Sequence, residues 1–153
     1  MYRYPAVLTP DTDSGAVVVT FPDVPEAITQ GSDVTDALRC AVDALETALS
    51  MYMDHRQDIP LPGSSRTKGT HHVTLPPIST AKVALYRELR SKRMKKAELA
   101  RQLGWQKSQV DRLLDLMHTS RLDQLEQALR VFDKVIVLEV KSLPNPGKLQ
   151  VAS

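Results

Sequence analysis

The sequence predicts an α+β fold, with a small β-sheet in the first half of the chain and helices in the second. Runs of β-branched residues lie within the first 31 positions, whereas apolar residues recur every three or four positions in most of the remainder. A Pro-, Gly- and Ser-rich stretch at 58–70 separates the two patterns. The length of 153 residues suits one or two small domains and excludes a large multidomain enzyme.

Three short strands are predicted before residue 32. Apolar residues alternate with others over 2–8, and the β-branched run at 16–21 follows the turn-forming sequence DTDSG at 11–15, which predicts a hairpin. Residues 27–30 form a third candidate strand. Because Pro5 has no backbone N–H to donate, we expect the first strand to lie at an edge of the sheet or to contain a bulge.

A helix is predicted over 34–53, where apolar side chains form one stripe. Ser32 or Asp33 is suited to cap its first turn. Three short strands cannot bury their faces alone, so this helix is expected to cover one face of the sheet. The polar stretch 58–70 should form a loop, and 72–75 should return as a fourth strand.

The second half of the chain has helical periodicity. The apolar spacing predicts helices over 79–93, 96–103, 107–117 and 122–132. Ser79 is expected to cap the first of them. A boundary at about 76–79 divides the chain into domains 1–76 and 77–143, and the tail 144–153 is expected to be disordered.

The sequence VIVLEV at 135–140 predicts a lone strand after these helices. The backbone N–H and C=O groups of such a strand need partners. A two-fold related copy is the simplest source, so this segment is the candidate interface of a homodimer. Pairing with the N-terminal sheet is the alternative, and higher oligomers through that sheet remain open.

Charge is unevenly distributed along the chain. Residues 1–76 carry 5 Lys/Arg and 10 Asp/Glu, whereas residues 77–153 carry 15 Lys/Arg and 8 Asp/Glu. The acidic half suits a basic protein partner and the basic half suits nucleic acid, although solvated charged faces give the same counts. Cys40 is the only cysteine, which excludes a disulfide framework and a thiolate metal cage. With no long apolar stretch and no signal peptide, a cytoplasmic location without membrane contact is expected.

Residues 96–116 have the spacing of a helix-turn-helix motif. Ala100 falls where the two helices would cross, and Gly104 falls in the turn, where a positive φ is required. Four apolar side chains would close the small core between the helices: Leu99, Leu103, Val110 and Leu113. An ordinary αα-hairpin in a helical domain is the alternative interpretation.

The helix over 107–117 would read DNA, because the N-terminal residues of such a helix reach base edges in the major groove. The candidate base contacts are Lys107, Ser108 and Arg112, followed by Gln106 and Gln109. The inward face of this helix is expected to contain Val110, Leu113, Leu114 and Met117.

Lys95 and Lys96 lie at the start of the preceding helix, where the helix dipole disfavours cations. An anionic partner would offset this repulsion, so both residues are expected to contact DNA phosphates. Trp105, in the turn, is expected to fill the core beneath it.

The run FPDVPEAITQGSDVTDALRCAVDAL, from Phe21 to Leu45, together with the helix-turn-helix spacing, resembles HicB antitoxins of the branch with a Cro/repressor-type motif. The resemblance covers about residues 1–141. It implies a partial RNase H-like fold for the N-terminal half, which would bind and neutralise HicA, a small basic toxin that cleaves mRNA. It also implies that the C-terminal half represses the operon by binding double-stranded DNA. Among the departures, Glu26-Ala27 stands where family members often have Gly-Cys.

The chain is not expected to be an enzyme or to hold a metal ion or a cofactor. Metal-dependent RNA cleavage through Asp11, Asp13 and Asp23 is one alternative, but turn formation explains Asp11 and Asp13 without a metal. A stand-alone transcriptional regulator whose N-terminal half senses a small ligand is the other alternative.

Overall fold

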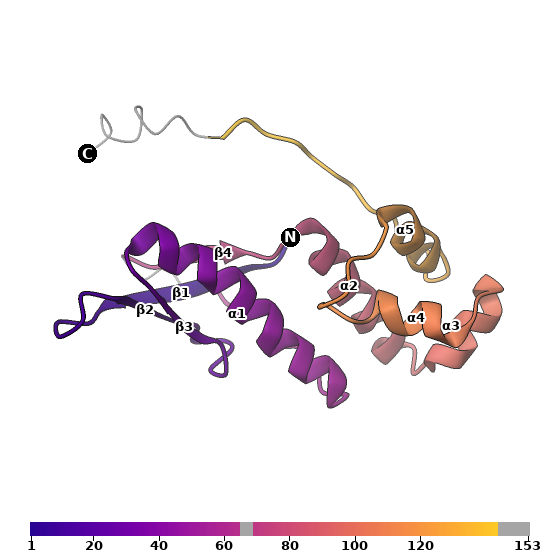
Figure 1. The fold of residues 1–153 in the computed structure, drawn as a ribbon. Coiled ribbons are helices and arrows are strands. Elements are labelled where there is room, and N and C mark those ends of the chain that lie inside the picture. The colour runs from indigo at the N-terminus through magenta and orange to yellow at the C-terminus, as the bar shows by residue number, and fades with distance from the viewer. Residues whose placement is uncertain (65–68, 144–153) are drawn as a thin grey trace.

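The computed structural model describes residues 1–64 and 69–143, and it has the mixed character that the sequence predicts. A four-stranded antiparallel sheet lies at one end of the molecule, and most of the five helices in the described residues gather at the other (Figure 1). The tail 144–153 and residues 65–68 of the predicted loop lie outside the described residues.

The sheet contains the four predicted strands, β1 (Arg3–Pro10), β2 (Val17–Thr20), β3 (Ile28–Gly31) and β4 (His71–Thr74), in the order β3-β2-β1-β4. The hairpin between β1 and β2 is confirmed. In its turn, the Gly15 N–H donates to the Asp11 carbonyl at 2.9 Å, and Gly15 has a φ of +72°. The Ser14 hydroxyl donates to the Asp11 carboxylate at 2.6 Å, as expected of a turn-forming aspartate.

The prediction that β1 lies at an edge is wrong, because β1 has a neighbour on each side. The two neighbours divide the strand, however: residues 7–10 pair with β2, and residues 3–6 pair with β4. At Pro5 the strand therefore pairs on one side only. A proline is tolerated there for the same reason that it is tolerated at a sheet edge.

Helix α1 (Val34–Asp54) begins at the predicted cap. The Asp33 carboxylate accepts the N–H of Asp36 at 2.8 Å, and the Asp36 carboxylate accepts the N–H of Ser32 at 2.9 Å. The helix then packs closely on the sheet. A Cβ atom on Gly31 would lie 2.2 Å from the backbone nitrogen of Ala37, so only glycine fits this position.

Helix α2 (Pro77–Ser91) begins two residues before the predicted start, and the prediction that Ser79 caps it is wrong. Pro76 occupies the cap position, and Pro77 stands in the first turn, where its missing N–H needs no partner. Ser79 is buried inside the first turn, and its hydroxyl donates to the carboxylate of Glu46 on α1. This hydrogen bond joins the two halves of the chain.

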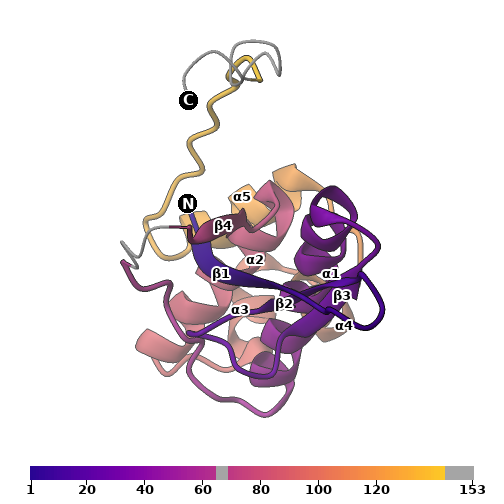
Figure 2. The same ribbon diagram turned by 90° about the vertical axis from the view of Figure 1, so that its left-hand side faces the viewer.

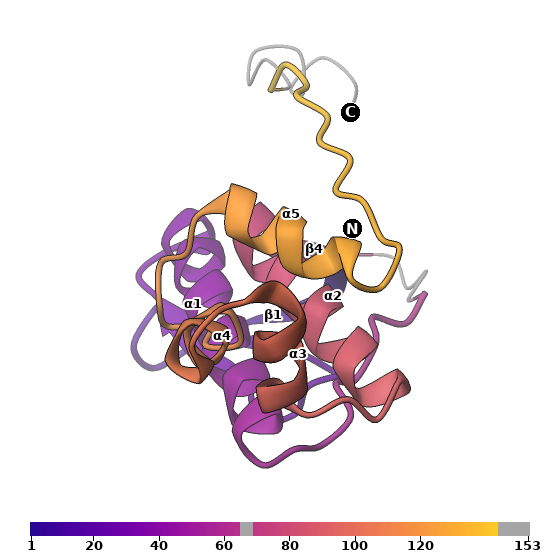
Figure 3. The same ribbon diagram turned by 90° about the vertical axis from the view of Figure 1, so that its right-hand side faces the viewer.

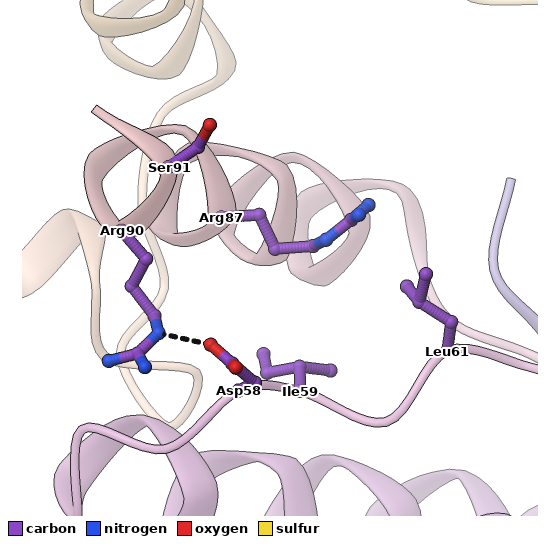
Figure 4. Close-up of a pocket in the computed structure, with 6 residues that line it drawn as sticks. All are labelled: Asp58, Ile59, Leu61, Arg87, Arg90 and Ser91. Carbon is purple, nitrogen blue, oxygen red and sulfur yellow. Dashed lines mark hydrogen bonds and ion pairs between the residues drawn. The ribbon is translucent and has the colours of Figure 1, made fainter. Parts of the chain in front are cut away.

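Further contacts attach α2 to the segment that follows α1. The Tyr86 hydroxyl donates to the carbonyl of Gln57 at 2.6 Å, and the Arg90 Nε lies 2.7 Å from the carboxylate of Asp58. A cavity of about 340 Å³ lies beside this ion pair (Figure 4). Buried residues from both halves form one continuous hydrophobic cluster. The division into domains 1–76 and 77–143 stays a prediction.

Three short helices complete the second half: α3 (Lys96–Leu103), α4 (Lys107–Leu113) and α5 (Leu122–Arg130). The bounds of α3 are as predicted, whereas α4 ends four residues early. The prediction that Met117 points inward is therefore wrong. Its side chain is 58% exposed, and Leu116 is buried instead, because the chain leaves the helical path after Leu113.

The predicted strand at 135–140 does not form within a single chain. The segment is extended and mostly exposed, and it leaves the helical body beyond α5 (Figure 3). The alternative, pairing with the N-terminal sheet, is not found either, since β3 and β4 are the outer strands of that sheet in the described residues. Dimerisation through this segment stays a prediction.

Candidate nucleic-acid interface

Helices α3 and α4 form a compact pair joined by a tight turn at residues 104–106. Gly104 ends α3 in the left-handed conformation, with φ +70°, and the N–H of Trp105 donates to the Ala100 carbonyl at 2.9 Å. Trp105 is half-buried against the core, as predicted. Leu99 and Val110 are fully buried, so the contact between the helices also agrees with the prediction.

Helix α4 presents most of the predicted base contacts to solvent, from Lys107 and Ser108 in its first turn to Arg112 in its last. Lys107, Ser108 and Arg112 are all exposed, and Gln106 is exposed beside them. Gln109 is half-buried, and its Oε1 accepts the backbone N–H of Gln106 at 2.9 Å. Its side chain thus closes the start of α4, a structural role that its sequence position three residues after the cap could have signalled.

The two predicted phosphate contacts differ in their surroundings. Lys95 is exposed and occupies the cap of α3 without a side-chain hydrogen bond. Lys96 is also exposed, but its Nζ lies 3.2 Å from a carboxylate oxygen of Asp111 on α4. This ion pair links the two helices at their surface, and it leaves Lys96 with part of its charge compensated.

The predicted residues therefore gather at one end of the molecule. Figure 3 shows α3 and α4 next to each other on the side remote from the strands. Residues 87–112, which include both helices, contain nine Lys/Arg and three Asp/Glu. Eight of these nine cations are exposed, and Arg90 is half-buried in its ion pair with Asp58. An excess of exposed cations is typical of a surface that binds nucleic acid.

Lys82 is a residue of this region that the sequence reasoning missed. It lies on α2, is fully buried, and donates from Nζ to the carbonyls of Arg112 (3.1 Å), Asp115 (2.6 Å) and His118 (2.5 Å). A cation at the C-terminal end of a helix complements the negative end of the dipole. Burial lowers the pKa of the Lys82 ammonium, against the opposing attraction of Asp115.

Lys82 could have been found from its spacing. It precedes Leu85, Tyr86 and Leu89 by three, four and seven positions, so it occupies the apolar stripe of α2. A lysine in such a stripe is buried only if its ammonium is hydrogen-bonded. Three carbonyls at the end of α4 satisfy this requirement.

The acidic residues near the sheet do not form a catalytic cluster. The Asp11 carboxylate accepts hydrogen bonds from its own turn, and the Asp23 carboxylate accepts the N–H of Gly63 at 2.8 Å. The hydrogen bond from Ser14 lowers the pKa of Asp11. Across residues 1–64 and 69–143, no group of three His, Cys, Asp or Glu side chains is arranged to hold a metal ion.

The cavity beside α2 carries little chemistry of its own (Figure 4). Its basic side chains already have partners within the chain. Arg90 is paired with Asp58, and Arg87 donates to the Tyr2 hydroxyl at 3.0 Å. The cavity therefore belongs to the junction between the halves, and its geometry gives no support to a ligand-sensing role. None of the helices in the described part of the chain is long and apolar enough to cross a membrane.

Comparisons with known proteins identify the family. A family model described as a HicB-like antitoxin of bacterial toxin–antitoxin systems matches residues 3–84, which span the whole sheet, α1 and the first turns of α2. The chain is 37% identical over 142 residues to Antitoxin HicB of Pseudomonas fluorescens, covering 93% of this chain and 96% of that protein. It is 36% identical over 136 residues to Antitoxin HicB of Escherichia coli, covering 89% of this chain and 97% of that protein.

A third relative, Antitoxin HicB 1 of Photorhabdus laumondii, is 34% identical over 139 residues, covering 91% of this chain and 87% of that protein. These matches extend through the helical half as well as the sheet. They make the chain an antitoxin rather than an enzyme, with a toxin as its partner. The resemblance seen in the sequence is confirmed: the chain belongs to the HicB-like antitoxin family of bacterial toxin–antitoxin systems.

Proposed function

We propose that this antitoxin neutralises a HicA-type mRNA-cleaving toxin through its N-terminal half and represses its own operon through its C-terminal half. In this proposal α3 and α4 form a DNA-binding helix-turn-helix, and the N-terminal half is a partial RNase H-like module without nuclease activity. The observation that carries the DNA-binding part is the exposure of Lys107, Ser108 and Arg112 together on α4, beyond a glycine turn.

Each residue of α4 has a distinct proposed role. The guanidinium of Arg112 donates twice to guanine in the major groove, and Lys107 and Ser108 contact bases or phosphates nearer the helix start. Gln106 contributes to base recognition beside them. Gln109 acts chiefly by holding the helix start, as its hydrogen bond to the Gln106 N–H suggests. Lys95 and Lys96 contact the phosphate backbone and set the register of the protein on the duplex.

A homodimer completes the proposed repressor. In 135–140 the side chains of Val135, Val137, Leu138 and Val140 are 59–88% exposed. A second copy of this segment supplies the backbone partners that a single chain lacks. The dimer would read two half-sites about 34 Å apart or a multiple of this distance.

Substitution of Arg112 by alanine tests the proposal. We expect the operator affinity of Arg112→Ala to fall by about 10- to 100-fold, since one bidentate base contact contributes about 1–3 kcal/mol. Toxin neutralisation in a growth-rescue assay should be unchanged. Arg130→Ala removes an exposed arginine at the end of α5 and is the matched control, with unchanged operator affinity.

The result of this experiment separates the two proposed duties. If a folded Arg112→Ala protein binds the operator like the wild type, α4 does not read DNA. If it loses toxin rescue while its thermal unfolding is unchanged, the assignment of one duty to each half is wrong.

A further inference from the structure

One face of the sheet carries side chains that none of the helices in residues 1–64 and 69–143 covers. The other face is the one on which α1 packs, where Tyr4, Ala6 and Val19 are fully buried (Figure 2). Because side chains alternate along a strand, the residues between these positions point away from α1.

The strand register arranges six of these residues in two rows. Val7, Thr20 and Ile28 are opposite one another in the first row, and Thr9, Val18 and Gln30 are opposite one another in the second. We call these six residues the open face. Val7 is 42% exposed and Ile28 is 63% exposed, although both are large apolar side chains. Apolar groups in one plane, alternating with polar groups able to form hydrogen bonds, are the composition of a protein-binding surface.

The charges around the open face are mostly acidic. Residues 3–38, which form β1, β2, β3, their connections and the start of α1, contain one Lys or Arg, Arg3 at the beginning of β1. Their acidic residues are Asp11, Asp13, Asp23, Glu26, Asp33 and Asp36. The β1–β2 turn places Asp11 and Asp13 next to the second row, and the β2–β3 connection places Asp23 next to the first row, whereas the Glu26 carboxylate of that connection accepts the hydroxyl of Tyr52 on α1. Both ends of the open face are therefore acidic.

We propose that the open face is the surface on which this antitoxin binds its toxin, and that the toxin presents an apolar patch rimmed by lysines or arginines. This inference rests on the proposed neutralising function and specifies where on the chain it occurs. The acidic rim repels nucleic acid, and it repels a second copy of the same face. A basic protein surface is the partner that both the apolar rows and the rim accommodate.

The experiment measures binding of the purified full-length chain to the toxin encoded by the reading frame next to its gene. Ile28→Lys places a charge in the first row, and we expect it to weaken the affinity by about 30-fold or more, as for a central interface residue. Met51→Lys is the matched control. Met51 lies on α1, is 48% exposed, and undergoes the same change of charge. Its affinity should stay within about threefold of the wild type.

A second pair of variants tests the acidic rim. In the double variant Asp23→Asn, Glu26→Gln, each new amide keeps the oxygen that accepts the existing hydrogen bond, from Gly63 and from Tyr52 respectively. Association at low salt should be about tenfold slower. The control is the double variant Asp43→Asn, Asp54→Asn, which removes two exposed charges from α1 and should associate at the wild-type rate.

The possible results distinguish this inference from the proposed function. If the wild type binds the toxin and Ile28→Lys binds equally well, the open face is not the binding surface, while the neutralising function stands. If Ile28→Lys and Met51→Lys are equally weak, the effect is not local and the inference fails. If Ile28→Lys instead changes the oligomeric state of the chain alone, the face binds a second copy. If the wild type does not bind the toxin, the proposed function itself fails. Thr9→Lys, in the second row, repeats the test should Ile28→Lys unfold.

Discussion

The two ends of this molecule differ in the sign of their surface charge. Residues 3–38, which include β1 to β3, contain six acidic residues and one basic residue, whereas 87–112, around α3 and α4, contains nine basic and three acidic residues. The net charge of the whole chain, +2, conceals this separation. The comparison teaches that the field of each end favours partners of the opposite charge, so that the proposed partner of one end would be repelled by the other.

The two ends also differ in how they are stabilised. The sheet and α1 depend on close backbone packing, for which the contact between Gly31 and Ala37 is the clearest case. The helical end depends on a buried cation, Lys82, that holds the end of α4. Changes in these two places should therefore affect one end more than the other.

The largest effect is expected from Gly31→Val. The added side chain collides with the backbone of α1, so the free energy of unfolding should fall by about 3 kcal/mol and toxin binding should be lost. Gly15→Ala is the control, because its Cβ meets nothing within 4 Å and only the positive φ is unfavourable. We expect it to cost about 1 kcal/mol in chemical denaturation. Equal losses for the two variants would contradict the account of close packing.

Lys82→Met should have the next largest effect. Methionine fills a similar volume but removes the ammonium that donates to three carbonyls. The Arg112 carbonyl keeps the Ser120 hydroxyl and the Asp115 carbonyl keeps the His118 N–H, so the substitution should cost about 2 kcal/mol. Operator affinity should fall more than toxin affinity when both are measured below the unfolding temperature. Lys134→Met removes a lysine that is 57% exposed and should change the free energy of unfolding by less than about 0.5 kcal/mol. A wild-type operator affinity in Lys82→Met would show that this contact does not position α4.

A smaller loss of stability is expected from Asp33→Ala at the start of α1. The substitution removes the side-chain acceptor for the Asp36 N–H and should cost about 1 kcal/mol. Asp33→Asn keeps an acceptor oxygen and should retain most of the stability in thermal unfolding. Operator binding should be unaffected by either variant, and a loss in both would indicate that the helical end is coupled to this cap.

Lys95→Ala should change the salt dependence of DNA binding rather than its sequence preference. Removing one phosphate contact weakens specific and nonspecific DNA alike and reduces the slope of log affinity against log salt by about 1. Titrations at several salt concentrations measure this slope for operator and random duplexes. A selective loss for the operator would assign Lys95 to base recognition instead.

The smallest expected effect is on acid stability. Hydrogen bonding from the Ser32 N–H and then from Arg39 holds the pKa of Asp36 below its ordinary value. The contribution of Asp36 to stability is therefore present above that ordinary value and is lost as the pH falls through the lowered pKa. Unfolding measured from pH 6 to pH 2 should show a shallower decline in Asp36→Asn than in the wild type. Parallel stability curves for the two proteins would show that Asp36 does not contribute to the loss of stability at low pH.

Much of the fold was predictable because its signals are local. The periodicity of α3 and the glycine at position 104 gave the correct helix bounds and the correct turn. The hairpin was equally accessible from the turn sequence at 11–15. The exposure of Lys107, Ser108 and Arg112 also agrees with the sequence prediction, while their contact with DNA stays a prediction.

The errors arise where distant residues decide the local structure. The sequence predicts Ser79 as the cap of α2, but its buried hydroxyl donates to the carboxylate of Glu46 on α1 instead. Helix α4 ends early where the carbonyls of Arg112, Asp115 and His118 turn toward Lys82, and Met117 is consequently exposed instead of pointing inward. The segment 135–140 has strand-forming residues, but no strand in the described residues pairs with it, and propensity alone does not supply such a partner.

Helix α2 has a mechanical consequence for the whole assembly. Its Tyr86 and Arg90 contact the segment after α1, and its Lys82 donates to the Arg112 carbonyl at the end of α4. The single helix α2 is therefore bonded to both halves of the molecule. A toxin bound at the sheet would consequently be held at a fixed angle to the axis of a DNA duplex bound at α4. In a complex of toxin, antitoxin and operator DNA, α2 would thus determine the orientation of the toxin relative to the DNA.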